Sequence, residues 1–356
     1  MYPRSPAHPG WWALAALVAL ALVAAWHGPA LLGEDVLTDE AYYLAAAAAV
    51  DQGRPLSSVQ GWFYPAPAAH LLNALFAFGP RPGLLLLRAL NTLGMVAVFV
   101  LAGVTVADGL RRHAWAPLLT GVLLWLWPTS QLFVHGNVSG ILFLPLLMAM
   151  RSRHAAARAL WLSLPAIGKP YALVTILTRS PREAVLPLLL TLAMAATTTP
   201  VGDLSAFEPL RHGANLSPWH WAVGMLHLPW VLVLGLPALL ATTWGRGSYG
   251  RGLCLGWALL PAAWAHSSAI LVVPLAFALR RWLPRPPSPG RTAALVALLL
   301  ATEAIRGAVP WRLLTRLPLS PFGLGLAKAC IPTLGVATIA VLVADPPWLR
   351  TRAQAG

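Results

Sequence analysis

The stretch WWALAALVALALVAAWHGPALL, residues 11–32, decides the fold of this chain. It carries no Asp, Glu, Lys or Arg, and about 20 apolar residues are enough to cross a bilayer as a helix. The stretch follows Arg4 and is too long for the apolar core of a signal peptide, so it predicts a membrane anchor. We predict a first span at 11–30 and further spans near 84–107, 115–134, 137–150, 184–200, 219–243, 252–265, 267–281, 291–308 and 322–343.

The composition excludes a soluble globule. Hydrophobic residues make up 58% of the chain and charged residues 10%, and the mean hydropathy is +0.68, whereas soluble domains carry about 25% charged residues. The net charge of +14 does not indicate nucleic acid, because the basic residues form short clusters between apolar runs. The sequence predicts one integral membrane domain over 1–356, an all-α polytopic transmembrane helical bundle with about ten to twelve membrane segments.

Short and broken helices belong to this prediction. The chain has 33 prolines, and broken helices within a membrane are tolerated where they line a cavity. Residues 65–78 are apolar but too few to cross easily, so they predict a re-entrant or surface helix. Residues 155–178 are interrupted by Pro165 and by Gly168-Lys169-Pro170, which predicts two half-helices that meet at Lys169.

Charge then orients the chain. With a cytoplasmic N-terminus, most of the 25 basic residues fall in cytoplasmic loops, as in other membrane proteins. Residues 30–65 then form a first extracytoplasmic loop with an acidic motif. Residues 284–291 form a Pro-rich cytoplasmic loop, and residues 345–356 form a cytoplasmic tail.

This topology brings unusual polar residues to the extracytoplasmic face. Ionisable groups near the bilayer core are costly and usually face a functional cavity. A carboxylate there can take a proton from a hydroxyl, and a lysine and a histidine can bind a phosphate and stabilise it as a leaving group. The set suits transfer of a group from a phosphorylated lipid to an alcohol. Its members are Asp39, Glu40, His135, Asn137, Lys169, Asn215 and His266.

Structural explanations exist for several of these residues. Thr38 or Asp39 could be the N-cap of a helix over 40–50, since acidic residues suit that end of a helix. His135 and His266 could be hydrogen-bonded at helix ends. Lys169 is harder to explain in this way, because it lies between glycine and proline, far from the charged loops, and needs an anionic partner.

A series of short motifs carries a family resemblance. The motifs are Thr38-Asp39-Glu40-Ala41-Tyr42-Tyr43, Asp51-Gln52-Gly53-Arg54-Pro55, Phe63-Tyr64-Pro65-Ala66-Pro67, His135-Gly136-Asn137-Val138-Ser139, Ile167-Gly168-Lys169-Pro170-Tyr171, Asn215-Leu216-Ser217 and Ala265-His266-Ser267-Ser268. In their order and rough spacing, over residues 10 to about 280, the chain resembles glycosyltransferase family 87, polytopic GT-C enzymes that use polyprenyl-phosphate sugars. Ala66, Asn137 and Ser139 depart from the family pattern, which leaves room for a sister GT-C family.

The resemblance implies an inverting transfer of a hexose, which is mannose in the best-known members. Asp39 would be the general base, Lys169 would hold the donor phosphate, and His266 would help to bind phosphate or sugar. Glu40 is a rival base, because other GT-C families use an Asp-Glu pair, sometimes with a metal. The remaining donor-binding candidates are His135, Asn137, Tyr43, Tyr64 and Asn215.

The implied setting is a bacterial cell membrane, with the active site on the extracytoplasmic side. The expected partners are a polyprenyl-phosphate sugar donor, a lipid or glycan acceptor and membrane lipids, with no nucleic acid and no separate cofactor. No metal ligands are assigned, and dependence on a divalent metal stays open. Two other functions stay open. A transporter or flippase of a lipid-linked anion could use Lys169 and His266 for binding without a base, and a membrane scaffold would need none of these residues.

Overall fold

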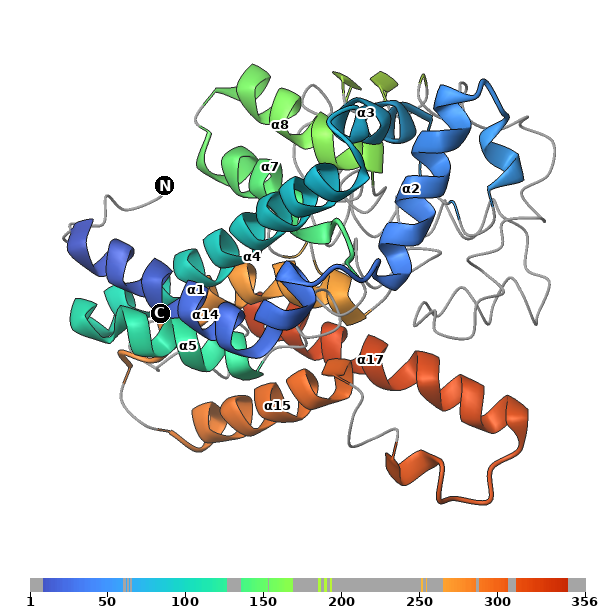
Figure 1. The fold of residues 1–356 in the computed structure, drawn as a ribbon. Coiled ribbons are helices and arrows are strands. Elements are labelled where there is room, and N and C mark those ends of the chain that lie inside the picture. The colour runs from blue at the N-terminus through green and yellow to red at the C-terminus, as the bar shows by residue number, and fades with distance from the viewer. Residues whose placement is uncertain are drawn as a thin grey trace.

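A computed structural model describes residues 9–59, 62, 64, 66–126, 136–152, 154–168, 265–285, 288–306 and 312–344, with a few single residues between 185 and 254. Every regular element in these ranges is a helix, and none of them is a strand. The all-α prediction is confirmed for this part of the chain (Figure 1).

Three helices of the described part are long and apolar enough to cross a membrane. They are α1 (Pro9–Leu32), α4 (Pro80–Leu110) and the part Gly323–Val343 of α17 (Pro321–Val343). They coincide with the spans predicted at 11–30, 84–107 and 322–343, and they support a membrane protein.

Other predicted spans are shorter helices in the structure. The 115–134 span is described as α5 (Ala116–Leu126), which follows the short turn η2 (His113–Trp115), and the 137–150 span is α7 (Ser139–Arg151). The 291–308 span is α15 (Pro289–Arg306). The 267–281 span is described as the 3-10 helix η5 (Ala265–Leu271), followed directly by α14 (Val272–Trp282). The spans predicted at 184–200, 219–243 and 252–265 lie essentially outside the described residues.

Two short helices follow α1. The first, α2 (Thr38–Asp51), is rich in alanine, which has the highest helix propensity, and carries Asp39 and Glu40 in its first turn. Its N-cap is Leu37, so the predicted Thr38 or Asp39 cap was wrong. The second, α3 (Ala66–Phe76), packs beside α2 and α4 and has 11 residues, about 16 Å, too short to cross a bilayer.

The long helix α4 is the centre of the described bundle. It packs against α1, α5, α7 and α14, and its Met95 and Phe99 are fully buried. Two glycines allow close approach of neighbouring helices. A Cβ on Gly94 would collide with the backbone of Gly140 on α7, and a Cβ on Gly103 would collide with Thr120 on α5. Small residues at helix crossings are typical of membrane bundles.

The bundle has two chemically different ends. At one end, α2 and α3 lie beside the start of α4 (Figure 1). At the other end, Gly109 of α4 contacts the Arg280 backbone of α14, and Arg281 Nη2 donates to the Val343 carbonyl at 2.9 Å. Which end faces the cytoplasm remains a prediction.

The helix α8 (Ala155–Gly168) is the first half of the predicted pair of half-helices. It packs against α7, contacts α3 and runs back toward α3 (Figure 1). It ends one residue before Lys169, which lies outside the described residues, as does the predicted second half.

The α4–α7 crossing generates a stability prediction. In Gly140→Val, the new side chain would meet the backbone of Asn91, which cannot rotate away. We expect destabilisation of roughly 1–3 kcal/mol or more, measured as a lower unfolding temperature of the protein in detergent. Gly28→Ala is the control, because nothing lies within 4 Å of a Cβ at that glycine of α1. If both substitutions lowered the unfolding temperature equally, the close approach of α7 to α4 at Gly140 would be contradicted.

Candidate functional site

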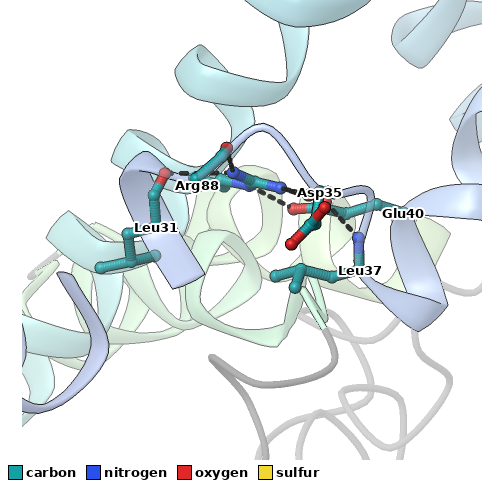
Figure 2. Close-up of polar contacts among 6 residues, drawn as sticks. Leu31, Asp35, Leu37, Glu40 and Arg88 are labelled. Carbon is teal, nitrogen blue, oxygen red and sulfur yellow. Dashed lines mark hydrogen bonds and ion pairs between the residues drawn. The ribbon is translucent and has the colours of Figure 1, made fainter. Parts of the chain in front are cut away.

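A buried ion pair joins α4 to α2. Arg88 Nε donates to Glu40 Oε1 and Arg88 Nη2 donates to Glu40 Oε2, both at 2.7 Å. Glu40 is fully buried and Arg88 is 6% exposed. The pair has the two-pronged geometry that gives arginine and carboxylate their strongest hydrogen bonds (Figure 2).

Arg88 also holds the loop between α1 and α2. Its Nη1 donates to the carbonyls of Leu31 at 3.2 Å and Gly33 at 2.9 Å, and its Nη2 donates to the Asp35 carbonyl at 2.7 Å. With the two bonds to Glu40, all five N–H donors of the guanidinium are used. The loop therefore has a fixed path, and so does the start of α2.

Glu40 is committed to this structure. Its Oε2 also accepts the backbone N–H of Leu37 at 2.9 Å, three residues earlier (Figure 2). Both carboxylate oxygens thus have short contacts inside the protein. A general base needs an oxygen that faces the acceptor hydroxyl, so this geometry favours Asp39 over Glu40.

Asp39 points to a different neighbour. Asn137 Nδ2 donates to Asp39 Oδ2 at 2.6 Å, across 98 residues of sequence. Asn137 is 4% exposed, and its Oδ1 accepts from both the backbone N–H (3.0 Å) and the hydroxyl (2.6 Å) of Ser139. Two donors on Oδ1 fix the orientation of the amide, so its NH₂ group faces the carboxylate. Asp39 itself is partly exposed.

Two tyrosines complete the cluster beside Asp39. Tyr43 lies one helical turn after Asp39, and its hydroxyl is 3.4 Å from the hydroxyl of Tyr64. The Tyr43 hydroxyl also accepts the backbone N–H of Val138 at 3.3 Å. The two rings meet edge to face at 5.9 Å, and the Trp62 ring lies 5.3 Å from Tyr64.

Burial sets the protonation of these phenols. It raises the pKa of Tyr43 and of Tyr64, and the negative charge of Asp39 raises both pKa values further. Both phenols therefore keep their protons at neutral pH and can donate hydrogen bonds.

A glycine turn connects the two halves of the site. Gly136 has a φ of 69°, a left-handed conformation that glycine adopts at no steric cost. A Cβ at this position would lie 2.6 Å from Glu40 Cγ. The turn thus rests on the buried carboxylate, next to a cavity with room for about one water molecule. The cavity is lined by Leu31, Leu37, Glu40, Leu87, Arg88, Asn91 and Gly136.

The structure brings together four of the predicted site residues, Asp39, Tyr43, Tyr64 and Asn137, with Glu40 buried next to them. His135, Lys169 and Asn215 lie outside the described residues, and only the backbone of His266 is described, in η5. No group of three or more His, Cys, Asp or Glu side chains in the described part could hold a metal ion.

Arg88 was missed by the sequence reasoning, although a signal was present. It is a charged residue within the apolar span predicted at 84–107, far from the basic loops. A charge in such a place is rare and needs a named partner. The same argument singled out Lys169, and applied to Arg88 it points to an acidic partner such as Glu40.

Comparison with known proteins adds no relative. No protein-family model matches the sequence, and neither a curated protein nor a solved structure matches it.

The ion pair predicts a large asymmetry between single and double substitutions. Arg88→Leu or Glu40→Leu alone leaves a buried charge without its partner, at a cost of about 3–5 kcal/mol. The double variant removes both charges, so we expect it to recover part of that loss. Thermal unfolding in detergent would measure all three. The exposed pair of Arg81 and Glu34, at 2.8 Å, is the control, for which Arg81→Gln should cost less than about 1 kcal/mol. If the destabilisation of the double variant equalled the sum of the two single destabilisations, the pairing of Arg88 with Glu40 would be contradicted.

The tyrosines predict an alkaline loss of stability. Their folded pKa values lie above the ordinary 10.0, so the unfolded state releases protons first as pH rises. The two tyrosines should leave the unfolding temperature unchanged up to about pH 9 and lower it above about pH 10. The fall should be smaller in the double variant Tyr43→Phe, Tyr64→Phe. An identical fall in both proteins would contradict buried phenols at this site.

Proposed function

We propose that the chain is a membrane glycosyltransferase that moves a hexose from a polyprenyl-phosphate donor to a lipid or glycan hydroxyl, with Asp39 as general base. The observation that carries the proposal is the different environment of two adjacent acids. Glu40 is bound on both oxygens by Arg88, whereas Asp39 is partly exposed and accepts one hydrogen bond from an oriented amide.

The Asp39 environment suits proton transfer from an alcohol. Among the described residues, the bond from Asn137 occupies Oδ2, which leaves Oδ1 for a substrate hydroxyl. Tyr43 and Tyr64 are protonated neighbours; since one phenol donates to the other, the second keeps its proton for a sugar oxygen. A carboxylate, an amide and a phenol pair thus lie close together, and the hydroxyl groups of a sugar can form hydrogen bonds with groups of these kinds.

The reaction balances without another reagent. The acceptor oxygen forms a bond to the anomeric carbon as the bond from that carbon to the phosphate oxygen breaks. The acceptor proton passes to Asp39, and polyprenyl phosphate leaves with the bonding electrons. Inversion at the anomeric carbon follows from a single displacement, and the base contributes about 10²–10⁴ in rate.

The motif order supports the same proposal. Residues 38–43, Tyr64 and 136–139 come from separate motifs of the family resemblance and meet at one end of the bundle. The helix α8 ends one residue before Lys169 and contacts α3, which follows Tyr64 in the chain. Within the proposal Lys169 binds the donor phosphate and His266 binds phosphate or sugar. His135 and Asn215 line the donor site, on the extracytoplasmic side of a bacterial membrane.

The function is tested with purified protein, a panel of polyprenyl-phosphate hexoses and membrane lipids, and products read by mass. Asp39→Asn should lose about 10²–10⁴ in transfer rate, because the amide cannot take the proton. Glu34→Gln, at an exposed carboxylate of the loop after α1 and outside the family motifs, is the matched control and should keep full activity. Retained activity in Asp39→Asn would remove this residue from the mechanism.

Two outcomes would favour the other functions. Movement of a labelled lipid across vesicles, with no new glycosidic bond, would identify a transporter or flippase. A wild type with neither transfer nor transport, in which combined substitution of Asp39, Lys169 and His266 changes nothing beyond stability, would identify a scaffold.

A further inference from the structure

The bundle end opposite Asp39 gathers positive charge. Arg111 and Arg112 follow the last residue of α4, and Arg280 and Arg281 lie in the last turn of α14. The close contact between Gly109 and the Arg280 backbone brings these two helix ends together. Arg281 Nη2 bonds to the Val343 carbonyl, which adds the end of α17 to the same surface.

The chain does not balance this charge in the part that the structure describes. Most of the acidic residues there lie at the other end, in the loop after α1 and on α2, and Glu303 is near the distal end of α15. The exception at the basic end is Asp108, whose side chain is 6% exposed and has Oδ1 2.9 Å from His113 Nδ1. Asp108 supplies one negative charge against the four arginines, and Arg111 and Arg112 are exposed to solvent.

The surroundings of Arg111 and Arg112 have two further features. Arg111 has φ 55° and ψ 31°, the left-handed conformation that usually selects glycine after a helix, and among the described residues it is the one non-glycine with positive φ. Arg112 lies over the ring of Trp115 at 5.0 Å, and Trp115 is 43% exposed. Arginine beside an exposed tryptophan is typical of the interface between membrane and water.

Next to the arginines, the surface of α5 is apolar. Leu118, three residues after Trp115 on α5, is 63% exposed. A soluble anion would use only the arginines, whereas a phospholipid also has acyl chains that can cover such a leucine. Guanidinium groups bind phosphate oxygens in pairs of hydrogen bonds.

We propose that this end of the bundle binds an anionic phospholipid, with its phosphate held by Arg111, Arg112 and Arg280 and its acyl chains along α5. The inference is independent of the glycosyltransferase proposal. It concerns other residues and needs no catalysis.

The test uses the full-length protein in detergent, equilibrated with equimolar phosphatidylglycerol and phosphatidylcholine. Lipid that co-elutes with the protein is quantified by mass. The wild type should retain phosphatidylglycerol in excess. The triple variant R111Q/R112Q/R280Q should retain at least about tenfold less of it, because three charges near an anionic lipid are lost.

The matched control is R54Q/R312Q/R316Q, which removes three exposed arginines that follow α2 or precede α17, whereas the basic surface includes the opposite end of α17. It should retain phosphatidylglycerol like the wild type. Equal retention of both lipids by the wild type, or equal losses in the two triple variants, would overturn the proposal.

Two measurements on the wild type keep the test decisive if the triple variant fails to fold. Raising NaCl from about 0.05 to about 0.5 M should reduce the phosphatidylglycerol excess, since salt screens the contact. Glycerol phosphate at the concentration of the lipid should not displace it. A salt-independent excess, or displacement by the soluble ester, would overturn binding of a lipid at this surface.

Discussion

The contact between Arg88 and Glu40 ties the described site together. Its two charges lie inside a largely apolar assembly, where either one alone would be strongly unfavourable. The guanidinium satisfies the carboxylate and also collects three carbonyls of the loop that leaves α1. That loop can therefore follow only one path, and this path sets where α2 begins and where the side chains of its first turn project.

Adjacent positions on a helix point about 100° apart, and the two acids use that difference. Glu40 turns toward α4 and meets Arg88, while Asp39 turns toward the 136–139 turn and meets Asn137. One carboxylate holds the backbone in place, and the other stays partly exposed at the surface of the cluster. An acidic pair in a sequence can thus contain one member bound on both oxygens and one that stays partly exposed, and only the neighbouring elements distinguish them.

Hydropathy and length predicted much of this arrangement. The apolar runs gave α1, α4 and α17 to within a few residues, because helices that cross a membrane must be long and nearly free of charge. The alanine-rich stretch after Thr38 gave α2.

The cap at Leu37 and the 3-10 helix before α14 were not predictable in this way, because they depend on contacts with distant residues. The same holds for the pairings of Glu40 with Arg88 and of Asp39 with Asn137, which join residues 48 and 98 positions apart. The roles of His135, Lys169, Asn215 and His266 stay predictions.

The left-handed turn at Gly136 has a mechanical consequence. Its backbone rests on Glu40, the next residue bonds to Asp39, and Ser139 begins the helix that is pressed against α4 at Gly94 and Gly140. These contacts restrict the position of the turn, because a shift toward α2 would bring its backbone against the buried side chain of Glu40. The partly exposed Asp39 therefore has a closely packed neighbour on the side of this turn.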